Sequence, residues 1–191
     1  DPPSPGLPNG DQFKTLPGVE FSRSRGLQDQ PFNLTLSHSK AQSQIVFTLD
    51  GSDPAVQGGT PYAAPLSISG TTIVRAFATH SAMEPAHVGT NSYLFMADTL
   101  AQTQASATGS GFPATWTEQN GSTWNQGGSR PGAWYGMDSA VLSAYTTSQL
   151  EDALSAAPTI SLSMAMEDWF GDGSTGPIAG IYCNSSQSGA G

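Results

Sequence analysis

Basic residues are scarce in this sequence. Only 6 of its 191 residues are lysine or arginine, against 15 aspartates and glutamates, and the formal net charge is -9. A nucleic-acid-binding protein needs a basic stripe for the phosphates, so this composition excludes that class. Charged residues of both signs make up 11% of the chain, whereas Gly and Pro number 22 and 14. Such a composition is typical of short strands joined by many turns.

Cysteine is nearly absent as well. Cys183 stands alone, which excludes an intramolecular disulfide and a cysteine-rich zinc site. A catalytic cysteine needs a histidine base, but His38, His80 and His87 lie in another part of the chain near predicted strand ends. We therefore interpret Cys183 as a half-buried thiol. No apolar run approaches the roughly 20 residues of a membrane span, and no cofactor motif is present.

The two ends of the chain resemble the interior of a longer polypeptide, so we expect this chain to be a piece of one. Residues 1–17 are rich in Pro and Gly and predict an extended linker. We expect two further parts, a β-sandwich over residues 18–96 and a loop-rich, partly α/β segment over residues 97–191.

The stretch QIVFTLDGSDP, residues 44–54, organises the middle of the chain. Ile45, Phe47 and Leu49 alternate with polar or β-branched residues, which predicts a strand with one strongly buried face. Asp50-Gly51 then supplies the positive φ that a tight turn needs.

Further strands with the same period of two surround this one. In residues 71–79 the sequence leaves open which face is buried, because Val74, Ala76 and Ala78 alternate with Ile73, Arg75 and Phe77. Residues 23–29 predict a polar loop. The other predicted strands cover residues 19–22, 31–39, a short edge element within 62–68, and 88–95. Their spacing without helical periodicity predicts a mainly β, immunoglobulin-like antiparallel sandwich.

The last third of the chain has a different character. Residues 97–105 predict one short helix and residues 139–156 another, whose apolar face includes Val141, Leu142, Tyr145, Leu150 and Leu154. Residues 159–166 alternate like a strand, and a further strand begins at Ile181. Because these strands come at the end of the segment, we expect residues 97–191 to be poorly packed by themselves.

Two family resemblances follow from these motifs. The blocks PFNLTL, IVFTLDGSDP, TTIVRAFA and TNSYLF within residues 19–95, with Tyr62, Pro65 and Leu66, resemble the C-terminal β-sandwich module of chitobiase and β-hexosaminidase-type enzymes. The same module is also described as fibronectin-III-associated. This resemblance implies an accessory module without catalytic residues.

The later motifs GFPATW, YGMDSAVLS, ALSAAPTISLSM and DWFGDGSTGPIAGIY look like the lead-in to a spore-coat CotH-like kinase domain of a bacterial, planctomycete-like surface protein. That family uses ATP and a divalent metal, but its catalytic residues correspond to no position in this chain.

Oxygen-bearing side chains gather at two places. Asp50, Ser52 and Asp53 could offer oxygens to calcium, but Asp and Ser are ordinary turn formers, so we predict turn structure. Arg75 is expected to pair with a nearby carboxylate.

The carboxylates of Glu167, Asp168 and Asp172 could serve glycoside hydrolysis, which needs two of them at a set separation. We interpret them as solvated loop residues. We predict neither catalytic nor metal-binding residues in the chain.

Aromatic rings are the remaining candidate ligand-binding groups, because a flat ring can stack on a sugar. The candidate aromatic residues are Tyr62, Trp116, Trp124, Trp134 and Tyr135. The alternative for them is a role in the core or at a domain contact, and the part played by the aromatic-rich loop 112–135 is left open. N-glycosylation frames occur at Asn33, Asn120 and Asn184.

The sequence thus predicts a non-catalytic accessory module, a spacer or weak carbohydrate- or cell-surface-binding domain, of a large extracellular bacterial protein. Its expected partners are glycans or neighbouring domains, without cofactors. The alternative is the front part of a CotH-like phosphotransferase.

Overall fold

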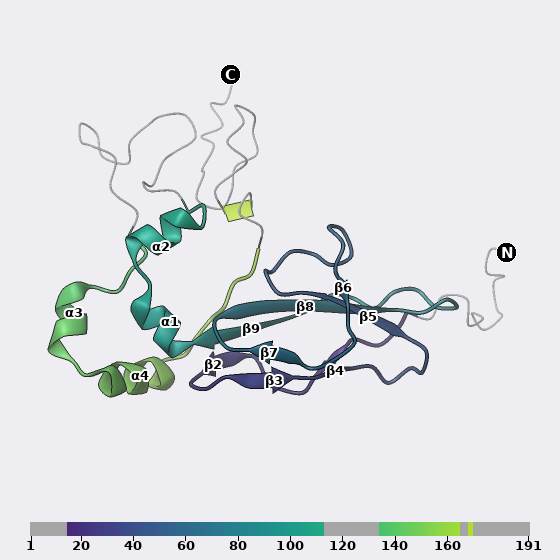
Figure 1. The fold of residues 1–191 in the computed structure, drawn as a ribbon, viewed down its shortest axis with the longest axis horizontal. Helices are drawn as coiled ribbons and strands as arrows, with labels where there is room; N and C mark the ends of the chain where they lie inside the picture. The colour runs from purple at the N-terminus through teal and green to yellow at the C-terminus, as the bar shows by residue number, and fades with distance from the viewer. Residues whose placement is uncertain (1–14, 113–133, 165–167, 170–191) are drawn as a thin grey trace, which may run out of the picture. The chain divides into compact units, whose positions relative to one another are not determined.

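The structure, a computed structural model, describes residues 15–112, 134–164 and 168–169. The chain divides into two units, residues 1–95 and residues 96–191. The first unit is a mainly β, immunoglobulin-like sandwich (Figure 1). Its strands are β1 Glu20–Phe21, β2 Gly26–Gln28, β3 Phe32–Leu34, β4 Leu36–Ser37, β5 Gln44–Thr48, β6 Thr60–Pro61, β7 Leu66–Ile68, β8 Thr72–Thr79 and β9 Gly89–Phe95.

Two layers of strands enclose the core of this unit. One layer is a five-stranded sheet in the order β2-β9-β8-β5-β6, and the other contains the pairs β3-β7 and β1-β4. Leu34, Leu36 and Ile68 reach the core from the smaller pairs. The large sheet contributes its own buried set, Phe47, Val74, Ala76, Ala78, Tyr93 and Phe95. Packing these two apolar faces against each other removes both from water, which is the main stabilising term of such a fold.

Strand β8 resolves the alternative that its sequence leaves open. Val74, Ala76 and Ala78 are fully buried, while Ile73, Arg75 and Phe77 are partly exposed. Small side chains at the centre of the sheet leave room for larger ones, such as Phe47 and Tyr93, to fill the same core.

Strand β5 confirms its predicted core residue Phe47 but not Leu49. Phe47 is 8% exposed, whereas Leu49 is 43% exposed. The reason is that β5 ends at Thr48, so Leu49 already belongs to the turn and no longer follows the alternation of the strand.

Two predictions about local structure are wrong in this unit. Residues 23–29 are not simply a loop, because β2 lies within them and pairs in parallel with β9; the sandwich is therefore not purely antiparallel. The predicted strand 31–39 is divided into β3 and β4, which pair with β7 and β1 respectively. Thr35 between them exchanges hydrogen bonds with Ser22 instead.

The predicted linker also ends earlier than residue 17. Leu16 is 3% exposed and belongs to the core. Its backbone N–H donates to the Glu84 carbonyl at 3.0 Å, and the Pro17 carbonyl accepts from Nε2 of His38 at 2.9 Å. Residues 15–17 are therefore part of the sandwich.

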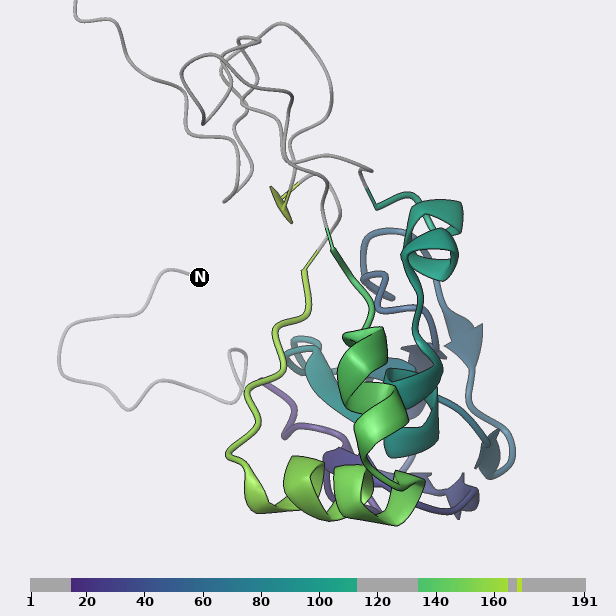
Figure 2. The ribbon, with the colours of Figure 1, turned by 90° about the vertical axis from the view of Figure 1, so that its left-hand side faces the viewer.

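The described part of the second unit contains helices and extended segments. The helices are α1 Met96–Ala101, α2 Gln104–Gly109, α3 Ser139–Ala144 and α4 Thr147–Ala156 (teal and green in Figure 2). Each predicted helix is thus two shorter ones. The second break falls at Tyr145, whose extended backbone (φ -127°, ψ 150°) ends α3, and Thr146 then caps α4. Tyr145 is consequently 56% exposed instead of sharing an apolar face.

The predicted strand 159–166 is wrong over its described residues. Residues 159–164 have no strand pairing, and Ile160 and Leu162 are 85% and 61% exposed. Among the described residues of this unit, the buried hydrophobic residues are Met96 and Ala107. The rest of that strand and the one at Ile181 lie outside the described residues. No helix in the described ranges is long and apolar enough to cross a membrane.

Candidate functional site

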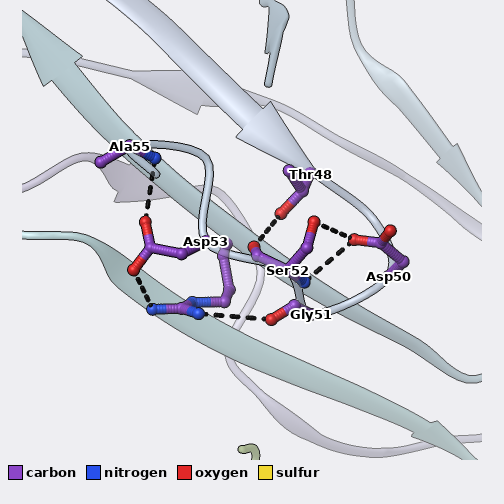
Figure 3. Close-up of polar contacts among 7 residues, drawn as sticks. Thr48, Asp50, Gly51, Ser52, Asp53 and Ala55 are labelled. Carbon is purple, nitrogen blue, oxygen red and sulfur yellow. Dashed lines mark hydrogen bonds and ion pairs between the residues drawn. The ribbon is translucent and has the colours of Figure 1, made fainter. Parts of the chain in front are cut away.

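The turn after β5 gathers more polar contacts than any other candidate named from the sequence (Figure 3). Oδ1 of Asp50 accepts two hydrogen bonds from Ser52, one from the backbone N–H at 3.0 Å and one from the hydroxyl at 2.5 Å. The Thr48 hydroxyl donates to the Ser52 carbonyl at 2.6 Å. The hydroxyl and backbone bonds from Ser52 hold the pKa of Asp50 below its ordinary value because they favour the carboxylate.

Arg75 fastens this turn to strand β8. The terminal nitrogen Nη2 donates to Oδ2 of Asp53 at 2.8 Å, and the terminal nitrogen Nη1 donates to the Gly51 carbonyl at 3.3 Å. Oδ1 of Asp53 accepts from the backbone N–H of Ala55 at 2.9 Å. The expected pairing of Arg75 with a carboxylate is confirmed, and its partner is a residue of the same turn.

These contacts favour a structural role for the turn over a cation site. Calcium needs six to eight oxygen ligands, usually with several free carboxylate oxygens. Here both oxygens of Asp53 and one of Asp50 are bonded within the chain, and a guanidinium lies beside Asp53. Across the described ranges, no group of three or more His, Cys, Asp or Glu residues is arranged to hold a metal.

Gly51 is the residue on which the turn depends most. Its φ is +81°, and a Cβ added there would lie 3.4 Å from the Ile73 side chain. Gly51→Val should lower the free energy of unfolding by about 1–3 kcal/mol, because a β-branched residue resists this backbone conformation. Circular dichroism recorded during a urea titration measures this loss of stability. Gly51→Asn is the matched control and should lose less, because asparagine tolerates positive φ; equal losses would contradict the argument.

The aromatic candidates separate into different environments. Tyr62 is half-buried, packs edge-on against Phe47 with the ring centroids 6.3 Å apart, and so lies against the core. It therefore offers no open platform. Trp134, in contrast, is 68% exposed. Trp116 and Trp124 lie outside the described residues.

Next to Trp134 in the chain, Tyr135 lines an open depression of about 360 Å³ in the second unit. Its ring packs edge-on against Phe112 at 5.3 Å. Its carbonyl accepts from the Gln102 amide at 2.6 Å, and its N–H donates to Gln104 at 3.2 Å. Asp98, Ser106 and Ser110 add polar groups to the lining. Rings beside hydroxyl and carboxylate groups are the chemistry that a sugar requires.

The remaining candidates are dispersed. Asp168 is exposed, while Glu167 and Asp172, with Cys183, Asn120 and Asn184, lie outside the described residues. Asn33 is exposed on β3. His38 and His80 each accept a backbone N–H on Nδ1 and so stabilise turns.

Sequence reasoning missed one polar network inside the sandwich. The hydroxyl of the fully buried Tyr93 donates to the Arg23 carbonyl at 2.9 Å. The Arg23 side chain donates to Gln28 at 2.7 Å and lies 4.7 Å from the centre of the Phe32 ring. A buried tyrosine late in a predicted β-sandwich, near a polar loop, is the signal that suggests such a contact.

Comparison with known proteins agrees with the fold of the first unit. No curated protein matches the chain. The resemblance of the later segment to a CotH-like lead-in receives no support from these comparisons, nor does a planctomycete origin. Residues 25–90 match the family model of the chitobiase/beta-hexosaminidase C-terminal domain.

Proposed function

We propose that residues 15–95 form a non-catalytic accessory module that acts as a spacer in an extracellular multidomain protein. The observation that carries this proposal is the state of the turn in Figure 3. The strongest candidate site residues were Asp50, Asp53 and Arg75. Asp50 accepts a hydrogen bond from Ser52 within the turn, and Arg75 of β8 donates to Asp53 and to the Gly51 carbonyl, so these contacts hold the loop to β8. Their polar groups are used to hold the shape of the loop and not to bind a ligand, which is what a spacer requires.

The exposed surface of the sandwich and the family that it matches support the same function. Its large exposed hydrophobic residues within the described ranges are Leu49 and Val56, neither of which has a ring to stack on a sugar. The matching family is named for a C-terminal domain of glycoside-cleaving enzymes, a description that fits an accessory part. We further propose that the protein is secreted or lies at the cell surface, and that its source is bacterial.

A second function, weak carbohydrate binding, is favoured by one observation in the second unit. Trp134 is 68% exposed and is the chain neighbour of Tyr135, and Tyr135 lines the depression together with Asp98 and Gln102. A sugar could stack on such a ring and bond to the polar rim. This candidate concerns residues 96–135 and leaves the spacer function of the sandwich unchanged.

Nuclear magnetic resonance of the isotope-labelled full chain tests the spacer function. During titration with chitin oligosaccharides, the backbone signals of residues 15–95 should stay in place. Saturable shifts clustered on residues 48–60 would overturn it. Shifts confined to residues 96–135 would support the second candidate if Trp134→Ala removes them and Tyr145→Ala, which changes another exposed ring, does not.

The rival phosphotransferase function makes a different prediction. Phosphoryl transfer needs a phosphate cradle, metal-holding carboxylates and a positioned base, but Arg130 is the one basic residue after residue 95. Calorimetric titration of the full chain with ATP and magnesium should therefore give no saturable heat. A micromolar dissociation constant that Asp168→Ala abolishes would instead place a nucleotide site in the last third of the chain.

A further inference from the structure

The first and last strands of the large sheet along the chain, β2 and β9, are paired side by side and run in the same direction. Strand β2 pairs in parallel with β9, the last strand of the unit, with Gly26 opposite Tyr93 and Gln28 opposite Phe95. The five other strand pairs in this unit's described sheets are antiparallel. The parallel pair therefore joins the incoming and outgoing parts of the chain.

The chain also enters and leaves this unit at opposite ends of the large sheet. At the entry, Leu16 donates to the Glu84 carbonyl at 3.0 Å, and Glu84 lies shortly before the start of β9. At the exit, the chain leaves from Phe95, the last residue of β9. The seven residues of β9 extend about 20 Å between these points. Tension on the chain ends is thus directed along the strands.

The direction of the strands decides how such tension acts. Once Leu16 has lost its contact with Glu84 and β1 has separated from β4, tension pulls β2 backwards from its N-terminal side and pulls β9 forwards from its C-terminal side. Because the two strands are parallel, they must slide past each other, and the hydrogen bonds between them are loaded together. Peeling apart an antiparallel pair from one end would load those bonds one after another. We propose that the β2-β9 pair is a mechanical clamp, which makes this module a load-bearing element of the protein.

Side chains strengthen the clamp where the chain enters β2. The Tyr93 hydroxyl of β9 donates to the Arg23 carbonyl at 2.9 Å, and the Asn91 amide approaches the same oxygen at 3.5 Å. The rings of Phe32 and Tyr93 pack edge-on at 5.1 Å, with the Arg23 guanidinium over Phe32. These contacts hold the segment before β2 against β9, so they too must break before the strands slide.

This inference rests on the proposed spacer function, and stretching single molecules of the full chain tests it. One geometry pulls on the chain ends. The other pulls on Ala41→Cys and Ser81→Cys, in a Cys183→Ser background, which opens β5 from β8 at the Gln44–Thr79 end. Unfolding of the sandwich is recognised in the first geometry by the release of roughly 280 Å of chain.

The clamp predicts a direction-dependent strength. Forced unfolding follows the unfolding rate along the pulled direction, so end-to-end pulling should need about twofold more force, or greater, than pulling at positions 41 and 81. Equal or lower force from the ends would overturn the clamp. The comparison uses one folded protein in both directions, so overall stability does not enter.

A pair of variants tests the side-chain contribution. Tyr93→Phe and Thr48→Val each remove one hydroxyl that donates to a backbone carbonyl, at 2.9 and 2.6 Å. Tyr93→Phe should lower the end-to-end force, whereas Thr48→Val should leave it unchanged; equal effects would contradict the assignment. Ligand-induced shifts of the nuclear magnetic resonance signals of the sandwich would overturn the spacer function, but they would not change the difference in unfolding force between the two pulling directions. The failure of the spacer function and the failure of the clamp are therefore distinguishable.

Discussion

Replacing Phe47 with alanine is expected to lower the free energy of unfolding of the sandwich by about 3–5 kcal/mol. Phe47, in strand β5, is 8% exposed and belongs to the core shared by both layers. Its ring also packs edge-on against Tyr62. Alanine would leave a cavity that the closely paired strands β5 and β8 cannot collapse to fill. Equilibrium denaturation in urea measures the loss.

Leu49→Ala is the matched control for this variant. Leu49 lies two residues further along and shares the sequence alternation of Phe47, but it is 43% exposed. The exposed position predicts a change within about 0.5 kcal/mol. A loss below about 1 kcal/mol for Phe47→Ala, or a larger loss for Leu49→Ala, would show that the buried face of this strand is wrongly assigned.

Gly59→Val is expected to cost about 3 kcal/mol, at the upper end of what overpacking usually costs. A Cβ at Gly59 would lie 2.7 Å from a methyl group of Val46, 2.8 Å from the Phe47 carbonyl oxygen and 2.9 Å from Pro54. The carbonyl oxygen belongs to the backbone of β5 and cannot rotate away. The loop must therefore lift from the strand, which disturbs the short pairing of β5 with β6. Thermal unfolding followed by circular dichroism would report the loss.

Gly18→Val makes the same chemical change where a Cβ would meet nothing within 4 Å. Neither glycine has a positive φ, so the comparison isolates the effect of space. Gly18→Val should be close to neutral. Similar losses at both positions would mean that valine acts through the unfolded chain, not through the contact at Gly59.

The sequence predicted the centre of the sandwich well because its signals there are local. The alternation around Phe47 and the Asp50-Gly51 pair predict strand β5 and its turn, and Gly51 does have a positive φ. The buried face of β8 could not be predicted, since both of its faces are largely apolar. That choice depends on what the opposite layer presents, which no local pattern contains.

The errors have a common physical cause, which is that pairing is decided by distant partners. Strand β2 is only three residues long and forms because β9 lies beside it. Residues 159–164 show the converse, since a good alternation without a neighbouring strand stays unpaired and exposed. The break at Tyr145 follows from the strong cap that Thr146 and Gln149 provide for α4, a signal that the apolar pattern obscured.

The candidate site was predictable in kind but not in geometry. Residue types alone suggested that Arg75 would find a carboxylate, but only the fold shows that it is Asp53, across from β8. Tyr62 looked like a possible sugar platform and is instead packed on Phe47. Exposure, not residue type, separates Tyr62 from Trp134, and exposure depends on the finished fold.

The central claim is that residues 15–95 make a self-sufficient sandwich, and urea unfolding of a fragment spanning residues 15–96 tests it most directly. We expect one cooperative transition with a slope of about 1–3 kcal/mol/M. A second fragment, residues 18–96, lacks Leu16, which is 3% exposed in the core, and should unfold at a lower urea concentration. A 15–96 fragment without a cooperative transition, or the same midpoint for both fragments, would contradict it.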